Sequence, residues 1–127
     1  MSRLRVMKIN NLEDLVVLLS MILSQLKSRR LNFDLRLIVI DSLSSLFNAI
    51  PSKGYFGLIK DLLFYFKSLT KKHFVGVMYT NNSKDTLTVQ KVTDVKNIVG
   101  EPLNWALDKQ IFASQLPSGE TTYVMIK

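Results

Sequence analysis

The chain has 127 residues, is 47% hydrophobic and 21% charged, and contains no cysteine. This length fits a single globular domain, and the lack of cysteine excludes disulfides and thiolate metal sites. Seventeen Lys and Arg against ten Asp and Glu give a net charge of +7, which favours a polyanionic partner such as DNA, RNA or a nucleotide phosphate. The most apolar run, Leu15 to Leu23, is far shorter than the ~20 residues that span a bilayer, so we expect no membrane partner.

The first elements expected along the chain are a short strand and a long helix. Leu4 to Ile9 mixes apolar and basic residues in a pattern that predicts a strand. Asn10-Asn11 then offers a helix N-cap, two carboxylates follow in the first turn, and apolar residues recur at helical spacing as far as Leu26. The wide apolar face of this helix predicts burial against a sheet.

A strand, a helix and a second strand follow. Leu35 to Asp41 is a short apolar run rich in β-branched residues, which is typical of a central parallel strand covered on both faces. Ser42 to Lys53 indicates a loop with one helical turn. The apolar stripe of Tyr55 to Lys71 predicts a second helix, and Phe74 to Thr80 predicts a second buried strand.

The last third of the chain combines a long loop with a hairpin. Asn81 to Val99 is polar and irregular, and a loop of this length in a compact domain is either functional or mobile. Ile111 to Ser114 and Thr121 to Ile126 predict two hairpin strands around Pro117-Ser118-Gly119. The order of elements predicts an α/β fold, with a mainly parallel sheet flanked by helices and a C-terminal β-hairpin.

Polar residues stand at the carboxyl ends of both predicted parallel strands. The first strand ends at Asp41-Ser42, and the second ends at Thr80, followed by Asn81-Asn82. Ligands of open α/β sheets bind beyond these ends, and a rigid, partly desolvated Asp there can hold Mg²⁺ as the Walker B carboxylate does. The amide of Asn82 could bond a terminal phosphate. The alternatives are that Asp41 caps the next turn and that the asparagines are ordinary turn residues.

Basic residues fall into a loop set and three pairs. Lys84, Lys91 and Lys96 lie on the long loop, where they could follow a DNA backbone. That loop has no aromatic side chain for base stacking, so a solvated loop is the alternative. The three pairs are interpreted as solvated ends of elements rather than as a binding stripe: Arg3/Arg5, Arg29/Arg30 and Lys71/Lys72.

Two segments resemble the RecA/Rad recombinases, specifically the eukaryotic Rad-fifty-one paralogues and, among these, the D member. Leu37 to Leu43 looks like their Walker B segment, in which Asp-Ser follows four apolar residues. His73 to Asn82 looks like their next strand, which ends Thr-Asn-Gln or Thr-Asn-His. Ser83 to Val99 would then be the second DNA-binding loop of the family, and Gly100 to Lys127, with Gly119-Glu120-Thr121, is similar to its closing hairpin. The resemblance covers nearly the whole chain.

The resemblance implies that residues 1–127 form a single partial RecA-like P-loop NTPase domain, the Walker B half of an ATPase core. Asp41 and Ser42 would contribute to a shared ATP and Mg²⁺ site, and Thr80 and Asn82 would face its phosphates. Lys84, Lys91 and Lys96 would face single-stranded or branched DNA. The implied function is homologous-recombination DNA repair in the nucleus, where the chain would assist recombinase filaments together with other recombinase paralogue subunits.

Departures from the family pattern limit the activity expected of the chain alone. No G-x-x-x-x-G-K-[ST] phosphate-binding loop occurs in the 127 residues, and the Walker A loop and catalytic Glu of the family would lie before residue 1. Asn82 stands where the family has Gln or His, and Lys109-Gln110 stands near a common Arg position. ATP hydrolysis by this chain alone is therefore not expected. The alternatives are a non-catalytic adaptor of the same fold and a fragment of another RecA-like ATPase.

Overall fold

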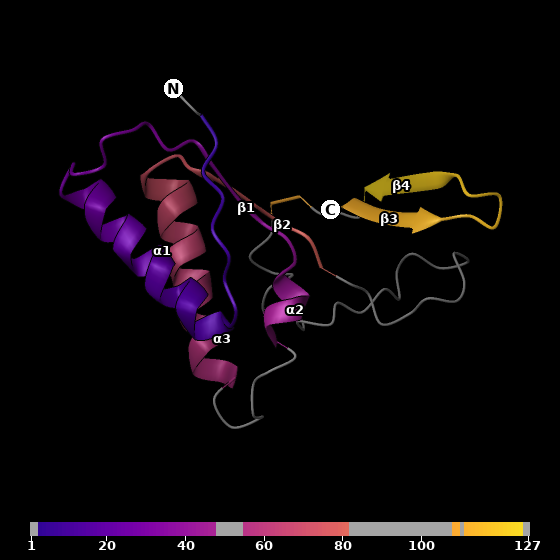
Figure 1. The fold of residues 1–127 in the computed structure, drawn as a ribbon, viewed down its shortest axis with the longest axis horizontal. Helices are drawn as coiled ribbons and strands as arrows, with labels where there is room; N and C mark the ends of the chain where they lie inside the picture. Colours follow the sequence, from indigo (N-terminus) through magenta and orange to yellow (C-terminus); the bar gives the residue numbers. More distant parts are fainter. Residues whose placement is uncertain (1–2, 48–54, 82–107, 110, 126–127) are drawn as a thin grey trace. The chain divides into compact units, whose positions relative to one another are not determined.

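The computed structural model describes residues 3–47, 55–81, 108–109 and 111–125, which belong to two units (Figure 1). Unit 1 is Met1–Asn81 and holds α1, β1, α2, α3, a π-helical turn and β2. Unit 2 is Asn82–Lys127 and holds β3 and β4. The described elements form a mixed α/β structure with a small parallel sheet, which agrees with the predicted fold class at that level.

Helix α1 runs from Leu12 to Lys27, close to the bounds expected from its apolar periodicity. Its N-cap is Asn11, whose side-chain oxygen accepts a hydrogen bond from the Asp14 N–H at 2.7 Å. At the other end the chain turns through Arg29, which has a φ of 53°. The N–H groups of Arg29 and Arg30 donate to the carbonyls of Leu26 and Gln25, so the helix ends in a Schellman motif with arginine in the usual glycine position.

The strand expected over Leu4 to Ile9 is not formed. Residues 4–10 have no regular secondary structure, and the side chains of Leu4, Val6 and Met7 are exposed. Alternating apolar residues form a strand where a neighbouring strand pairs with them and a core buries one face. Within the described residues this segment pairs with no strand, and its apolar side chains are mostly exposed. Its Arg5 instead stacks on Phe33 in the link after α1, with the guanidinium carbon 4.2 Å from the ring centroid.

The parallel pairing predicted for the two apolar strands is confirmed. Strand β1 (Leu37–Ile40) pairs with β2 (Gly76–Tyr79), with Leu37 opposite Gly76 and Ile40 opposite Tyr79. The connection between them contains α2 (Leu43–Phe47) and α3 (Tyr55–Lys67), and α3 continues as a π-helix over Ser68–Lys72. Figure 1 shows α1 and α3 packed side by side, both leading back toward the starts of the strands.

One face of this sheet lies against the helices and the other is open. Ile40 and Val75 are buried, and the Phe66 ring of α3 stacks on Tyr79 with a centroid separation of 5.8 Å. The core is completed by leucines and other apolar side chains: Leu12, Leu15, Leu19, Leu23, Leu43, Leu46, Phe47, Ile59, Leu62 and Leu69. On the other face Leu37 is 57% exposed, and Val39 and Met78 are each 56% exposed. The expectation that β1 is covered on both faces is therefore wrong.

The described part of unit 2 contains the antiparallel hairpin that the sequence predicts. Strand β3 (Ile111–Gln115) pairs with β4 (Thr121–Met125), with Ile111 opposite Met125. The turn closes through hydrogen bonds from the Leu116 N–H to the Glu120 carbonyl and from the Gly119 N–H to the Leu116 carbonyl. Gly119 has a φ of 88°, which a residue without a Cβ adopts at least cost.

Candidate functional site

Asp41 and Thr80 meet at the carboxyl ends of β1 and β2. The Thr80 hydroxyl donates to Asp41 Oδ1 at 2.5 Å. The Thr80 backbone also bonds on both sides of Asp41, because its N–H donates to the Ile40 carbonyl at 3.0 Å and its carbonyl accepts from the Leu43 N–H at 2.9 Å. Threonine therefore fixes the turn that carries the carboxylate. The peptide bond between Asp41 and Ser42 is cis.

The Asp41 carboxylate lies in solvent rather than in the partly desolvated setting expected for it. Asp41 is exposed, because the residues that follow β1 turn away into α2 and leave its side chain uncovered. Within the described residues its hydrogen bond comes from Thr80 to Oδ1, and Oδ2 has no such partner there. One oxygen is thus held in place while the other is open to water or a cation.

Ser42 is half-buried and bonded toward α2. Its hydroxyl oxygen accepts from the Ser44 hydroxyl at 3.4 Å, and its carbonyl accepts from the Ser45 hydroxyl at 2.7 Å. Ser42 therefore adjoins the carboxylate in the chain and ties the turn to the helix that follows.

Two residues beside Thr80 carry buried polar groups with no partner in the described part of the chain. These groups are the Tyr79 hydroxyl and both amide atoms of Asn81. Burial raises the pKa of Tyr79 to about 12. A buried polar group without a partner costs about 1–3 kcal/mol, so the Asn81 amide would be stabilised by a hydrogen-bonding partner. Sequence reasoning assigned the rim amide to Asn82 and missed Asn81, although the run Thr-Asn-Asn contains both.

The donor set at this rim fits a Mg²⁺ ion that is held by one protein carboxylate and not by an all-protein cage. Magnesium in nucleotide enzymes takes one or two carboxylates and completes its shell with water and substrate phosphates. Asp41 supplies one carboxylate oxygen, with the Thr80 hydroxyl fixed beside it. The described residues contain no group of three or more His, Asp or Glu that would form an all-protein cage. Asp41 would hold such an ion, which would neutralise phosphate charge.

The remaining predicted site residues lie outside the described residues. These are Asn82 at the rim and Lys84, Lys91 and Lys96 on the loop expected to face DNA. The structure therefore brings Asp41, Ser42 and Thr80 together and leaves the other predictions as they stood.

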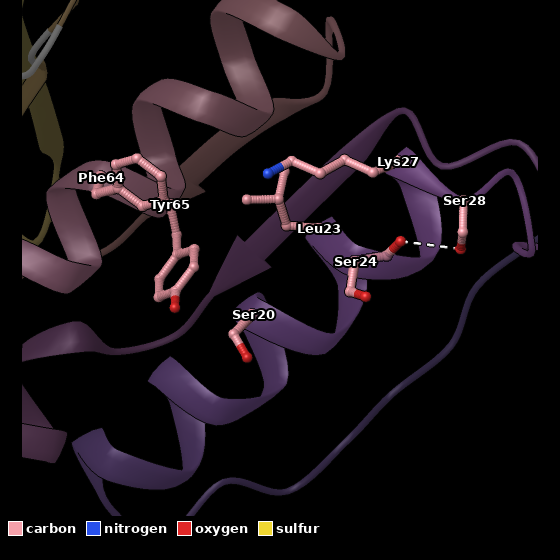
Figure 2. Close-up of a pocket in the computed structure, with 7 residues that line it drawn as sticks. All are labelled: Ser20, Leu23, Ser24, Lys27, Ser28, Phe64 and Tyr65. Atoms are coloured by element: carbon pink, nitrogen blue, oxygen red, sulfur yellow. Dashed lines mark hydrogen bonds between the residues drawn. The ribbon is translucent and has the colours of Figure 1, made fainter.

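A separate groove lies between α1 and α3 and contains none of these residues. It has a volume of about 560 Å³ and opens widely to solvent. Figure 2 shows Ser20, Leu23, Ser24, Lys27 and Ser28 along α1, with Phe64 and Tyr65 of α3 opposite. The Ser28 hydroxyl is occupied by the Ser24 carbonyl at 2.9 Å. The groove is a shallow seam between two packed helices and not part of the Asp41 rim.

No protein-family model, no curated protein and no solved structure matches the chain. Among the described helices, none is long and apolar enough to cross a membrane.

Proposed function

We propose that this chain provides the Walker B side of a Mg²⁺-nucleotide site in a RecA-like assembly that acts in homologous-recombination DNA repair. The observation that supports it is the hydrogen bond between Thr80 and Asp41, which places an acid and a hydroxyl from neighbouring parallel strands at one rim. Ligands of open α/β sheets bind at this edge. The order of strand endings, Asp-Ser and then Thr-Asn, is the one found in the recombinase paralogues.

The division of roles follows from the chemistry of the rim. The open oxygen of Asp41 would take the cation, directly or through water, and Thr80 would keep the carboxylate in one orientation. The side-chain NH₂ of Asn81, which is buried in this structure, would have to turn outward to donate a hydrogen bond to a phosphate oxygen. Because the 127 residues contain no phosphate-binding loop, the β- and γ-phosphates would be cradled by a partner subunit at a shared site.

The nucleotide part of the proposal is tested with Asp41→Asn in a complex with a recombinase paralogue that carries a Walker A loop. Anisotropy of a fluorescent ATP analogue with and without Mg²⁺ should show about tenfold or greater loss of the Mg²⁺-dependent affinity, because the cation loses its carboxylate. Asp61→Asn is the matched control, since Asp61 is an exposed carboxylate on α3. Equal affinities for all three proteins would remove Asp41 from the site.

The DNA part of the proposal is tested on the loop lysines. Lys84→Ala combined with Lys91→Ala should weaken single-stranded DNA binding more at low salt than at high salt, because phosphate contacts act through counterion release. Lys60→Ala, which removes an exposed cation of α3, is the control. An equal loss at both salt concentrations would contradict phosphate contacts by the loop.

A non-catalytic adaptor of RecA-like fold is the second candidate, and the open face of the β1–β2 sheet favours it. Parallel sheets are almost always covered on both faces, whereas Leu37, Val39 and Met78 are exposed in unit 1. An adaptor would bind recombinase paralogues through this face whether or not nucleotide is present. Co-precipitation that survives Asp41→Asn and nucleotide removal, but is lost with Val39→Asp, would favour the adaptor over the nucleotide site.

A further inference from the structure

The end of unit 1 opposite Asp41 gathers basic and aromatic side chains from two separate links. The link after α1 leads into β1, and the link after the π-helix leads into β2. Since Leu37 pairs with Gly76, and the Gly76 N–H donates to the Arg36 carbonyl at 2.8 Å, the two links lie side by side where the strands begin. We call six exposed side chains the strand-start surface, five of them on these links and one, Lys72, at the end of the π-helix: Arg29, Arg30, Phe33, Arg36, Lys72 and Phe74.

Charge is unevenly divided between the two ends of the unit. The strand-start surface has four cations, and one carboxylate, Asp34, lies among them in an exposed ion pair with Arg36 at 2.8 Å. Arg5 adds a fifth cation, because it is stacked on Phe33. The other end of α1 carries Glu13 and Asp14 in its first turn, and Asp41 directly follows β1. Members of all three basic pairs, which were interpreted from sequence as solvated ends of elements, thus lie on these links, next to them in the chain, or stacked against them.

The Phe74 ring stands outside the core of unit 1. Its side chain is 79% exposed, so it adds little to the core, and its φ of 55° is an unusual value for a bulky residue. It occupies the left-handed position after the π-helix, where the Val75 N–H bonds back to the Leu69 carbonyl at 3.0 Å. Glycine would fill this position at lower cost. A strained, exposed aromatic ring among cations points to a ligand with both negative charge and a flat face.

We propose that the strand-start surface binds single-stranded nucleic acid, with the cations on the phosphate backbone and the Phe74 ring stacked on a base. Arginine is suited to this because its planar guanidinium forms paired bonds to phosphate and also stacks on rings, as Arg5 does on Phe33. This surface shares no residue with the loop of the proposed function, and it needs neither nucleotide nor Mg²⁺.

The same chemistry would suit an anionic membrane less well. Proteins that lie on a membrane use an amphipathic helix whose apolar face enters the lipid. Both long helices of unit 1 turn most of their apolar stripe to the core, as the buried Leu12, Leu19 and Leu62 show, although Val17, Met21 and Phe64 on them are exposed. What the strand-start surface offers instead is single rings spaced among cations, which is the pattern of a platform for bases.

The test uses substitutions that relieve backbone strain while they remove a contact. Arg29 and Phe74 both have positive φ, so Arg29→Gly and Phe74→Gly should leave the protein as stable as before or more so. A loss of binding then cannot be attributed to unfolding. Tyr123→Ala, which removes a ring of unit 2 that is 71% exposed, is the control for Phe74→Gly. Lys60→Ala is the control for the removed charge.

Binding of the full chain to fluorescent oligothymidine is measured in buffer with EDTA and no nucleotide, over a range of salt. Phe74→Gly should weaken binding about tenfold, the lower part of the range for one base–aromatic stack. Arg29→Gly with Arg30→Ala should lower the slope of log affinity against log salt by about 1.4, since each single-strand phosphate contact contributes about 0.7. The two control variants should bind like the unchanged chain.

Three results would overturn the proposal. They are no binding of oligothymidine by the unchanged chain, equal binding by the glycine variants, and binding to phosphatidylserine vesicles with none to oligothymidine. The loop lysine and Asp41 variants are measured in parallel. If the glycine variants bind oligothymidine normally while the Asp41 variant loses Mg²⁺-dependent nucleotide affinity or the loop variant loses DNA affinity, only the strand-start proposal fails. If the glycine variants lose oligothymidine binding while the Asp41 and loop variants are unchanged, only the proposed function fails.

Discussion

The two faces of the β1–β2 sheet are built from alternate residues of the same strands, yet they meet different surroundings. Ile40 is 8% exposed and its neighbour Val39 is 56% exposed, although the two residues differ by one methylene group. The covered face packs on α3, as the stacking of Phe66 on Tyr79 shows. Residue type therefore indicates that a strand is apolar on both faces, and only the neighbouring elements decide which face is covered.

The largest expected effect compares adjacent residues on opposite faces. Ile40→Ala should cost about 2–5 kcal/mol of the free energy of unfolding, because it removes buried methyl groups and leaves a cavity. Val39→Ala should cost under about 1 kcal/mol, since the side chain already contacts water. Urea denaturation of both variants measures the difference. Similar losses would mean that the open face is covered in solution, and the comparison of the two faces would fail.

The next effect concerns the hydrogen bond between Thr80 and Asp41 at the carboxyl ends of the two strands. Thr80→Val removes the hydroxyl that bonds to Asp41 and should cost about 1 kcal/mol, a value reduced by the exposure of the carboxylate. Thr80→Ser retains the hydroxyl and serves as the control. Chemical denaturation should place the serine variant between the valine variant and the unchanged protein. A valine variant as stable as the serine variant would show that the hydrogen bond adds nothing.

A smaller effect, in the stabilising direction, is expected at the end of α1. Arg29→Gly should raise the free energy of unfolding by about 1 kcal/mol. Arg29 adopts a left-handed conformation, which is unfavourable by at least that amount for any residue with a Cβ. Arg30→Gly removes the same charge one position later, where φ is not positive, and should give no gain. Thermal denaturation compares the two variants. Equal changes would attribute the effect to charge rather than to backbone conformation.

The last effect is absent at neutral pH and is confined to alkaline conditions. Burial raises the pKa of Tyr79 from 10.0 to about 12, so the unfolded chain loses this proton first. The stability that comes from the neutral phenol is complete below pH 10 and is lost as the pH rises through 12. Tyr79→Phe lacks this component, so its stability relative to the unchanged protein should increase over that interval. A constant difference in unfolding free energy from neutral pH upward would contradict the raised pKa.

Local signals in the sequence predicted most of the described elements. The cap at Asn11, the turn at Gly119 and the apolar periodicity of the helices act within a few residues, and each element that depends on them is present. The parallel pairing of β1 and β2 followed from their order and their continuous apolar runs. These features were predictable because neighbours along the chain determine them.

The failures all concern partners that are distant in the chain. Leu4 to Ile9 has the residues of a strand but no neighbouring strand, and Val39 has those of a core residue but no cover. Asp41 was expected to be desolvated because the strand before it is apolar, although its exposure depends on where α2 turns. The meeting of Asp41 with Thr80 was anticipated from strand order, whereas the partnerless amide of Asn81 depends on packing that no local pattern records.

The double attachment of Thr80 has a mechanical consequence. Its backbone is bonded to Ile40 on one side of the Asp41 turn and to Leu43 on the other, and its side chain holds the carboxylate itself. A pull or twist on the polypeptide beyond Asn81 is therefore transmitted to Asp41 within a single residue. A partner that binds the chain after β2 would therefore change the orientation of the Asp41 carboxylate.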